Sequence, residues 1–113
     1  MQIINKTKNT VLAENAAVAD TILKRMKGLL GRKDFKEGEA LVLKPCNSVH
    51  TFFMSLPIDV VFVDSDNKVV KAISVMPPFR LSRIYFKASL AIELPAGTIA
   101  KTSTQPGDLL YLR

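Results

Sequence analysis

The residues best suited to chemistry lie in one short stretch of the chain, from Pro45 to Val63. It contains the only cysteine, Cys46, and the only histidine, His50. Such a pair can act as nucleophile and general base when a third group, here Asp59 or Glu93, orients the imidazole. The proline, asparagine and serine around the pair predict a loop, so the four-residue spacing does not itself bring the two side chains together. Cys46, His50 and Asp59 are therefore candidate catalytic residues, beside a structural interpretation with a buried thiol and a hydrogen-bonded loop histidine.

Asp59 is unusual because it interrupts the apolar run Ile58–Val63 directly after Pro57. A buried carboxyl group needs hydrogen-bond or charge partners. Backbone amides, Arg32 or an arginine of segment 76–89 would provide them. We favour a structural brace at the start of the following hairpin over catalysis, because structural ion pairs also bury carboxylates.

No motif in the sequence indicates a metal ion or a cofactor. Zinc sites use three or four ligands, and the chain offers one cysteine and one histidine. The run Asp64–Asn67 resembles the start of a calcium loop but lacks the later glycine and glutamate, so a hairpin turn explains it better. A glycine-rich phosphate loop is also missing. We predict neither a metal nor a cofactor.

The composition predicts one globular domain over residues 1–113, with 48% apolar and 23% charged residues. A single cysteine excludes an internal disulfide. No apolar run is long enough to span a bilayer, and the first residues lack the apolar region of a signal peptide. We expect a cytoplasmic monomer, although removal of a leader would leave the same sequence.

The formal net charge of +6 comes mainly from residues 24–36 and 71–87. Such basic stretches can bind nucleic acid, an acidic polymer or an anionic surface. No aromatic stripe typical of RNA-binding domains accompanies them. A solvated basic face that aids solubility is the preferred interpretation, with nucleic-acid binding as the alternative.

The hydrophobic pattern predicts a β-rich α+β fold. Strands are expected over residues 2–7, 10–19, 40–43, 58–63, 68–75, 89–94 and 109–112, with a break near Glu14 and Asn15 and a helical turn within 98–105. The clearest hairpin joins 58–63 to 68–75. We expect a mostly antiparallel sheet, half-closed or closed like a small barrel, with one main helix packed on it. Residues 76–89 form the longest irregular segment and suit a functional loop.

That helix is expected to span about three turns over residues 22–30. Asp20 or Thr21 would cap its N-terminus, and Gly31 would end it. Its apolar face would consist of Ile22, Leu23, Met26, Leu29 and Leu30.

Several motifs resemble those of one family. Arg25–Arg32 resembles R-x-x-G-L-M-x-R, and His50–Met54 followed by Pro57–Asp59 resembles a His-Thr-Phe-Phe-Met core before a Pro-Ile-Asp strand. Ile92–Gly97 and Gly107-Asp108 match the closing motifs. On these residues the chain resembles the domain-of-unknown-function 192 family (uncharacterised protein family 0127) over nearly its whole length. The resemblance implies a small bacterial or archaeal domain with no established activity.

The resemblance also implies a set of motif residues, which fall on Gly28, Leu29, Arg32, His50, Met54, Asp59, Glu93, Gly97, Gly107 and Asp108. Within this set Arg32, His50, Asp59 and Glu93 are the polar residues expected to converge, and together with Met54 they are the candidate ligand-binding residues. The two last glycines are expected in turns that need unusual backbone angles.

Three functions follow from these observations. The leading hypothesis is a non-enzymatic binding or accessory domain for a small molecule or an anionic ligand, because no complete catalytic constellation is present. The alternative is a small hydrolase or transferase that uses Cys46 or His50 with Asp59. The second alternative is nucleic-acid or anionic-polymer binding through the basic face.

Overall fold

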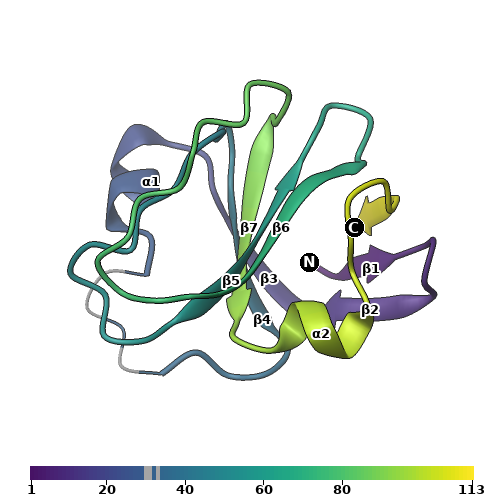
Figure 1. The fold of residues 1–113 in the computed structure, drawn as a ribbon, viewed down its shortest axis with the longest axis horizontal. Helices are drawn as coiled ribbons and strands as arrows, with labels where there is room; N and C mark the ends of the chain where they lie inside the picture. Colours follow the sequence, from purple (N-terminus) through teal and green to yellow (C-terminus); the bar gives the residue numbers. More distant parts are fainter. Residues whose placement is uncertain (30–31, 33) are drawn as a thin grey trace.

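The computed structural model describes residues 1–29, 32 and 34–113, without the side chain of Met26. Two β-sheets and two short helices make up the fold (Figure 1). The three-stranded sheet has the order β2 (Thr10–Ala13), β1 (Ile3–Asn5), β8 (Leu110–Leu112). The five-stranded sheet has the order β3 (Asn15–Ala19), β4 (Glu39–Leu43), β7 (Leu90–Pro95), β5 (Ile58–Val63), β6 (Val69–Met76). The helices are α1 (Ile22–Lys27) and α2 (Thr98–Thr102).

All described strand pairs are antiparallel except β3 beside β4, which is parallel. The predicted β-rich α+β class is therefore confirmed, and the sheets are half-closed rather than a closed barrel in the part of the chain that the structure describes.

Two hydrophobic cores lie on opposite faces of the five-stranded sheet. In the first core, Val61 and Ile92 pack with residues of the three-stranded sheet and α2. In the second core, Phe62 and Ala91 pack with residues that follow α1 and with segment 77–89. Figure 1 shows α1 on the left of the large sheet and the small sheet with α2 on its right. Because side chains alternate along a strand, the parity of a residue in β5 or β7 decides which core it enters.

β5 and β6 form the predicted hairpin. Its turn is held by Asp64, whose Oδ1 accepts hydrogen bonds from the backbone N–H groups of Asp66 at 2.9 Å and Lys68 at 3.0 Å. Asn67 has a left-handed φ of 63°, which asparagine tolerates better than most residues. This Asx-type turn explains the acidic cluster that resembled a calcium loop.

α1 is shorter than predicted. Thr21 caps its N-terminus as expected, because its Oγ1 accepts a hydrogen bond from the N–H of Lys24 at 3.1 Å. The helix ends at Gly28, whose φ of 44° and ψ of −125° suit only glycine well. The predicted stop, Gly31, lies outside the described residues.

The predicted apolar face of α1 is wrong in part. Ile22 is 68% exposed and Leu23 is 79% exposed, whereas Leu29 is buried. The side chain of Met26 and the residue Leu30 lie outside the described part. A helix of six residues cannot cover a sheet, and Ile22 instead lines a cavity. Neither described helix is long or apolar enough to cross a membrane.

Candidate functional site

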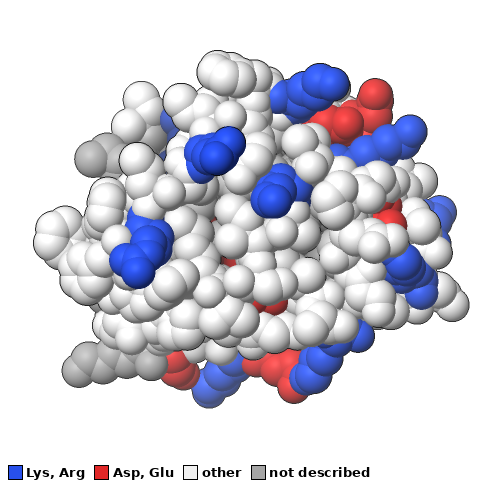
Figure 2. Space-filling model, in the orientation of Figure 1, with Lys and Arg blue, Asp and Glu red and all other residues white. Residues whose placement is uncertain are grey.

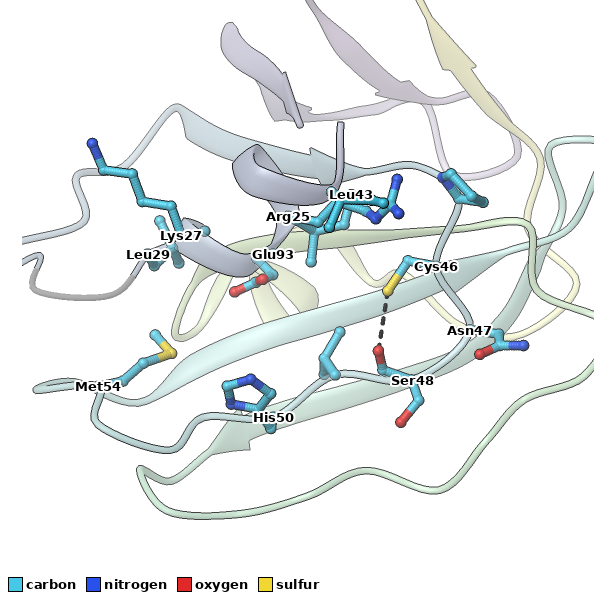
Figure 3. Close-up of a pocket in the computed structure, with 14 residues that line it drawn as sticks. Arg25, Lys27, Leu29, Leu43, Cys46, Asn47, Ser48, His50, Met54 and Glu93 are labelled. Atoms are coloured by element: carbon cyan, nitrogen blue, oxygen red, sulfur yellow. Dashed lines mark hydrogen bonds between the residues drawn. The ribbon is translucent and has the colours of Figure 1, made fainter. Parts of the chain in front are cut away.

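A cavity of about 360 Å³ opens beside α1, on the face of the large sheet that carries the second core. One wall comes from α1 and the residues after it, and the other wall comes from segment 45–50. Leu43, Met54 and Glu93 complete the lining (Figure 3). The polar side chains around the cavity are Arg25, Lys27, Cys46, Asn47, Ser48, His50 and Glu93.

Glu93 is the buried acidic group of this cavity. It belongs to β7, where Ala91 also faces the second core, and its residue is only 5% exposed. Figure 3 shows its carboxyl directed into the space between α1 and the segment that carries His50. Among the described residues no hydrogen bond or ion pair reaches this carboxyl. Burial raises the pKa of Glu93 to about 7, so the group can gain or lose a proton near neutral pH.

Cys46 lies on the opposite wall as a protonated thiol. Its Sγ donates a hydrogen bond to the carbonyl oxygen of Ser48 at 3.1 Å (Figure 3). Burial raises the pKa of the Cys46 thiol, with a smaller contribution from the negative charge of Glu93, and outweighs the opposing effects of the Ser48 backbone hydrogen bond and of Arg25. Since the thiolate is the reactive form, this environment makes Cys46 a weak nucleophile.

His50 stands at the mouth of the cavity and is exposed. Its ring stacks on Phe52, with ring centroids 5.4 Å apart and planes inclined by 23°. No hydrogen bond joins it to Cys46 within the described residues. The two candidates share one cavity, but they do not form a nucleophile–base pair.

The structure places Asp59 on the other face of the sheet. Across the β5–β7 pair, Val60 lies opposite Glu93 and Asp59 lies opposite Leu94, so the two acidic residues point into different cores. Asp59 is fully buried and accepts three backbone N–H hydrogen bonds, from Val75 at 2.8 Å, Gly97 at 3.1 Å and Ile99 at 2.8 Å. The structural brace is present, with backbone amides and no arginine as its described partners.

Arg32 also lies away from the cavity. Its Nη2 donates to Oε2 of Glu39 at 3.1 Å, and its guanidinium lies 5.7 Å from the ring centroid of Phe35. The predicted convergence of Arg32 and Asp59 with His50 is therefore wrong, because other partners hold both residues elsewhere. No three His, Cys, Asp or Glu side chains gather as a metal site in residues 1–29, 32 and 34–113.

Arg25, like Lys27, Asn47 and Ser48, lines the cavity but was not among the candidates from the sequence. Its Nη1 donates to the carbonyl oxygens of Asp20 at 3.4 Å and Lys44 at 3.3 Å, and so ties α1 to the chain that leaves β4. The sequence did contain a signal for Arg25, because Arg25 is the first residue of the R-x-x-G-L motif that ends in Arg32.

Comparison with known proteins places this chain in a family. The family model DUF192, described as Uncharacterized ACR, matches residues 3–112. The chain belongs to the DUF192 family. A UPF0127 protein of Thermococcus kodakarensis is 35% identical over 112 residues, which are 96% of this chain and 71% of that protein. A DUF192 relative from Pyrococcus horikoshii, also named UPF0127 protein, is 33% identical over 112 residues and matches 94% of each chain.

A solved structure shares the DUF192 fold. The protein of unknown function from Novosphingobium aromaticivorans superposes with a TM-score of 0.87 over 99% of this chain and 84% of that one, at 19% identity. These comparisons confirm the resemblance read from the motifs. Neither the family description nor the names of these relatives state an activity, so a function must be argued from the cavity itself.

Proposed function

We propose that this DUF192 protein is a small-molecule-binding module whose ligand presents a hydrogen-bond donor to Glu93. One observation carries the proposal: a buried carboxyl faces a cavity and has no hydrogen-bond partner among the described residues. No described side-chain oxygen is both fully buried and without a partner, so the Glu93 oxygens are open to the cavity. Because a low-dielectric site strengthens a hydrogen bond to a charged group, a donor supplied by a ligand makes Glu93 the natural anchor of a binding site.

The surroundings of Glu93 narrow the class of ligand. With a pKa of about 7, the carboxyl is largely ionised above neutral pH and then favours a cationic donor such as an ammonium group. Leu29, Leu43 and Met54 give the cavity apolar walls that suit a short alkyl portion. A small primary amine is the simplest molecule that combines both properties.

The geometry favours binding over covalent catalysis. Cys46 keeps its proton and donates to Ser48, and His50 is exposed on Phe52 rather than bonded to the thiol. Asp59, the third member of the catalytic alternative, faces the opposite core.

Nucleic-acid binding stays a prediction. In the first basic stretch Lys24, Arg32 and Lys36 each have a carboxylate partner.

An NMR titration of the ¹⁵N-labelled protein tests the proposal with three probes of equal length: butylamine, butanol and butyrate. At about pH 8, we expect butylamine to shift the amide signals of residues 46–50 and 93 most, because its ammonium donates to an ionised carboxyl with charge assistance. Butanol, a neutral donor, should shift them less, and butyrate, which has no proton to donate at this pH, should leave them unchanged. Glu93→Gln should weaken butylamine binding about tenfold or more, since a charged hydrogen bond is lost.

Glu14→Gln is the matched control, because Glu14 is exposed and lies outside the cavity. Equal butylamine shifts in wild type and Glu93→Gln would refute the proposed anchor. Tighter binding of butyrate than of butylamine would also contradict it.

A further inference from the structure

A second surface is unusual for a protein of this size, because large apolar side chains are exposed on two neighbouring segments, 52–53 and 75–86. Their exposed fractions run from 38% to 86%. We call these residues the apolar face: Phe52, Phe53, Val75, Phe79, Leu81, Ile84 and Phe86. Soluble proteins rarely expose so many large apolar residues together without a partner.

The two segments are fixed against one another by hydrogen bonds. The N–H of Thr51 donates to the carbonyl of Arg80 at 2.9 Å, and the N–H of Phe79 donates to the carbonyl of Thr51 at 2.9 Å. The Thr51 hydroxyl donates to the carbonyl of Pro77 at 2.6 Å and accepts from the N–H of Arg80 at 2.9 Å. The rings of Phe53 and Phe79 meet edge to face, with centroids 6.1 Å apart. The exposed rings are thus held in place by a buried threonine.

The backbone is also held in an unfavourable form at this surface. Phe53, Val75 and Phe79 have left-handed φ values of 64°, 51° and 62°. Such angles are uncommon for bulky residues and rarest for β-branched ones, so surrounding contacts must maintain them. Asp59 provides one such contact, because its Oδ1 accepts the N–H of Val75. The fold therefore maintains strain where it turns apolar residues outward.

The charge around the apolar face has one sign. Arg80 and Arg83 are exposed between its members, Lys87 is exposed directly after Phe86, and the sequence contains no acidic residue from 67 to 92. None of the described ion pairs involves these three cations. Figure 2 shows the side of the molecule over which residues 77–88 pass. There the surface is largely uncharged with separate blue side chains, and the red side chains gather mainly at the right and lower edges.

We propose that the apolar face and these three cations dock the protein on the surface of an anionic lipid bilayer. Aromatic and branched aliphatic side chains enter the boundary between headgroups and acyl chains, while arginine and lysine meet anionic headgroups. The four phenylalanine rings of the face could stack on bases, but Val75, Leu81 and Ile84 offer no ring, so a bilayer fits the whole face better than nucleic acid. The contact is peripheral, and it adjoins the Glu93 cavity, because the ring of Phe52 stacks on His50 at the mouth of that cavity.

Vesicle flotation tests the proposal with phosphatidylcholine vesicles, with and without phosphatidylserine. We expect the protein to float with the phosphatidylserine vesicles at low salt and to be released as salt rises. The variant Phe53→Ser/Phe86→Ser and the variant Arg80→Gln/Arg83→Gln/Lys87→Gln should each lower the bound fraction about tenfold or more. All five positions are exposed, so both variants should keep the wild-type thermal unfolding curve.

Matched controls come from another part of the surface. Tyr111→Ser removes an exposed aromatic ring, and Lys6→Gln/Lys68→Gln/Arg113→Gln removes three exposed cations. Both controls should float like wild type. The proposal fails if wild type does not float, or if the controls lose as much binding as the apolar-face variants. Self-association or oligonucleotide binding that Phe53→Ser/Phe86→Ser abolishes, without vesicle binding, would assign this face to another partner and overturn it.

Discussion

Glu93 links the stability of this protein to pH because its carboxyl is buried beside a cavity. Burial raises its pKa from the usual 4.5 to about 7, so the folded protein holds this proton more tightly than the unfolded chain does. A raised carboxyl pKa means that stability is highest when the group is protonated and falls as pH rises through the interval between the two values. The same carboxyl that we propose as a ligand anchor therefore destabilises the empty protein in weakly alkaline solution.

Replacing this carboxyl should remove the effect. The difference in free energy of unfolding between Glu93→Gln and wild type should rise by roughly 2 kcal/mol from about pH 5 to about pH 8. Wild type loses stability over this range as Glu93 ionises, whereas glutamine has no proton to lose. Urea denaturation at the two pH values measures this difference. Glu14→Gln, at an exposed site, should show no such gain. An equal effect of Glu93→Gln at both pH values would contradict the raised pKa.

The choice between Glu93 and Asp59 shows what sequence can and cannot resolve at this scale. Both residues interrupt apolar strands, and the sequence selected both as polar candidates. Which one faces the cavity depends on strand parity and on the register that sets Val60 opposite Glu93 and Asp59 opposite Leu94. That register is fixed by packing between distant parts of the chain, and a single sequence does not display it.

At the scale of elements, Asp59 joins three of them. Its carboxyl lies in β5, accepts the N–H of Val75 where the β5–β6 register shifts, and accepts two N–H groups at the start of α2. Gly97, the N-cap residue of α2, has no side chain with which to cap the helix. Asp59 therefore satisfies two of the N–H donors that a helix start leaves without an intrahelical partner.

Asp59→Ala should lower the free energy of unfolding by about 3 kcal/mol or more, because three N–H donors lose an acceptor and two of them start a helix. Urea denaturation measures the loss, and hydrogen exchange should quicken at Val75, Gly97 and Ile99. Asp66→Ala, in the exposed hairpin turn, is the control and should change stability little. A loss below about 1 kcal/mol would show that the hydrogen bonds of Asp59 contribute little to the stability of the fold.

Most elements were readable from the sequence because their signals are local. β-branched runs mark β5 and β6, and the Asp64–Asn67 cluster marks the turn between them. The length of α1 was not readable. Leu29 continues the helical spacing, but the backbone angles of Gly28 end the helix at Lys27.

At the scale of the whole molecule, Asp108 ties the beginning of the chain to its end. Its carboxyl accepts hydrogen bonds from the Asn5 side chain at 2.9 Å, the Lys8 ammonium at 2.9 Å and the Gln105 N–H at 3.1 Å. Burial opposes its ionisation, but these donors together hold the pKa of Asp108 below its usual value. A lowered carboxyl pKa gives stability that is present above the unfolded value and is lost as pH falls through the folded one.

Asp108→Asn should therefore cost about 2 kcal/mol of unfolding free energy at neutral pH, since a charge-assisted network is lost. The gap to wild type should narrow below about pH 4, where the unfolded carboxyl becomes protonated. Denaturant titrations across this range measure the gap. Asp66→Asn serves as the exposed control. A gap that stays constant down to strongly acidic pH would argue against a lowered pKa.

The central place of β1 in the small sheet has a consequence for synthesis. Ile3 pairs with Ala13 on one side and with Leu112 on the other, so β1 is not completed until the last strand has left the ribosome. The β5–β6 hairpin, by contrast, closes through neighbouring residues and can form while the chain is still growing. Nascent chains would thus carry an open first core until β8 has emerged, and in that interval they would be natural clients for chaperones.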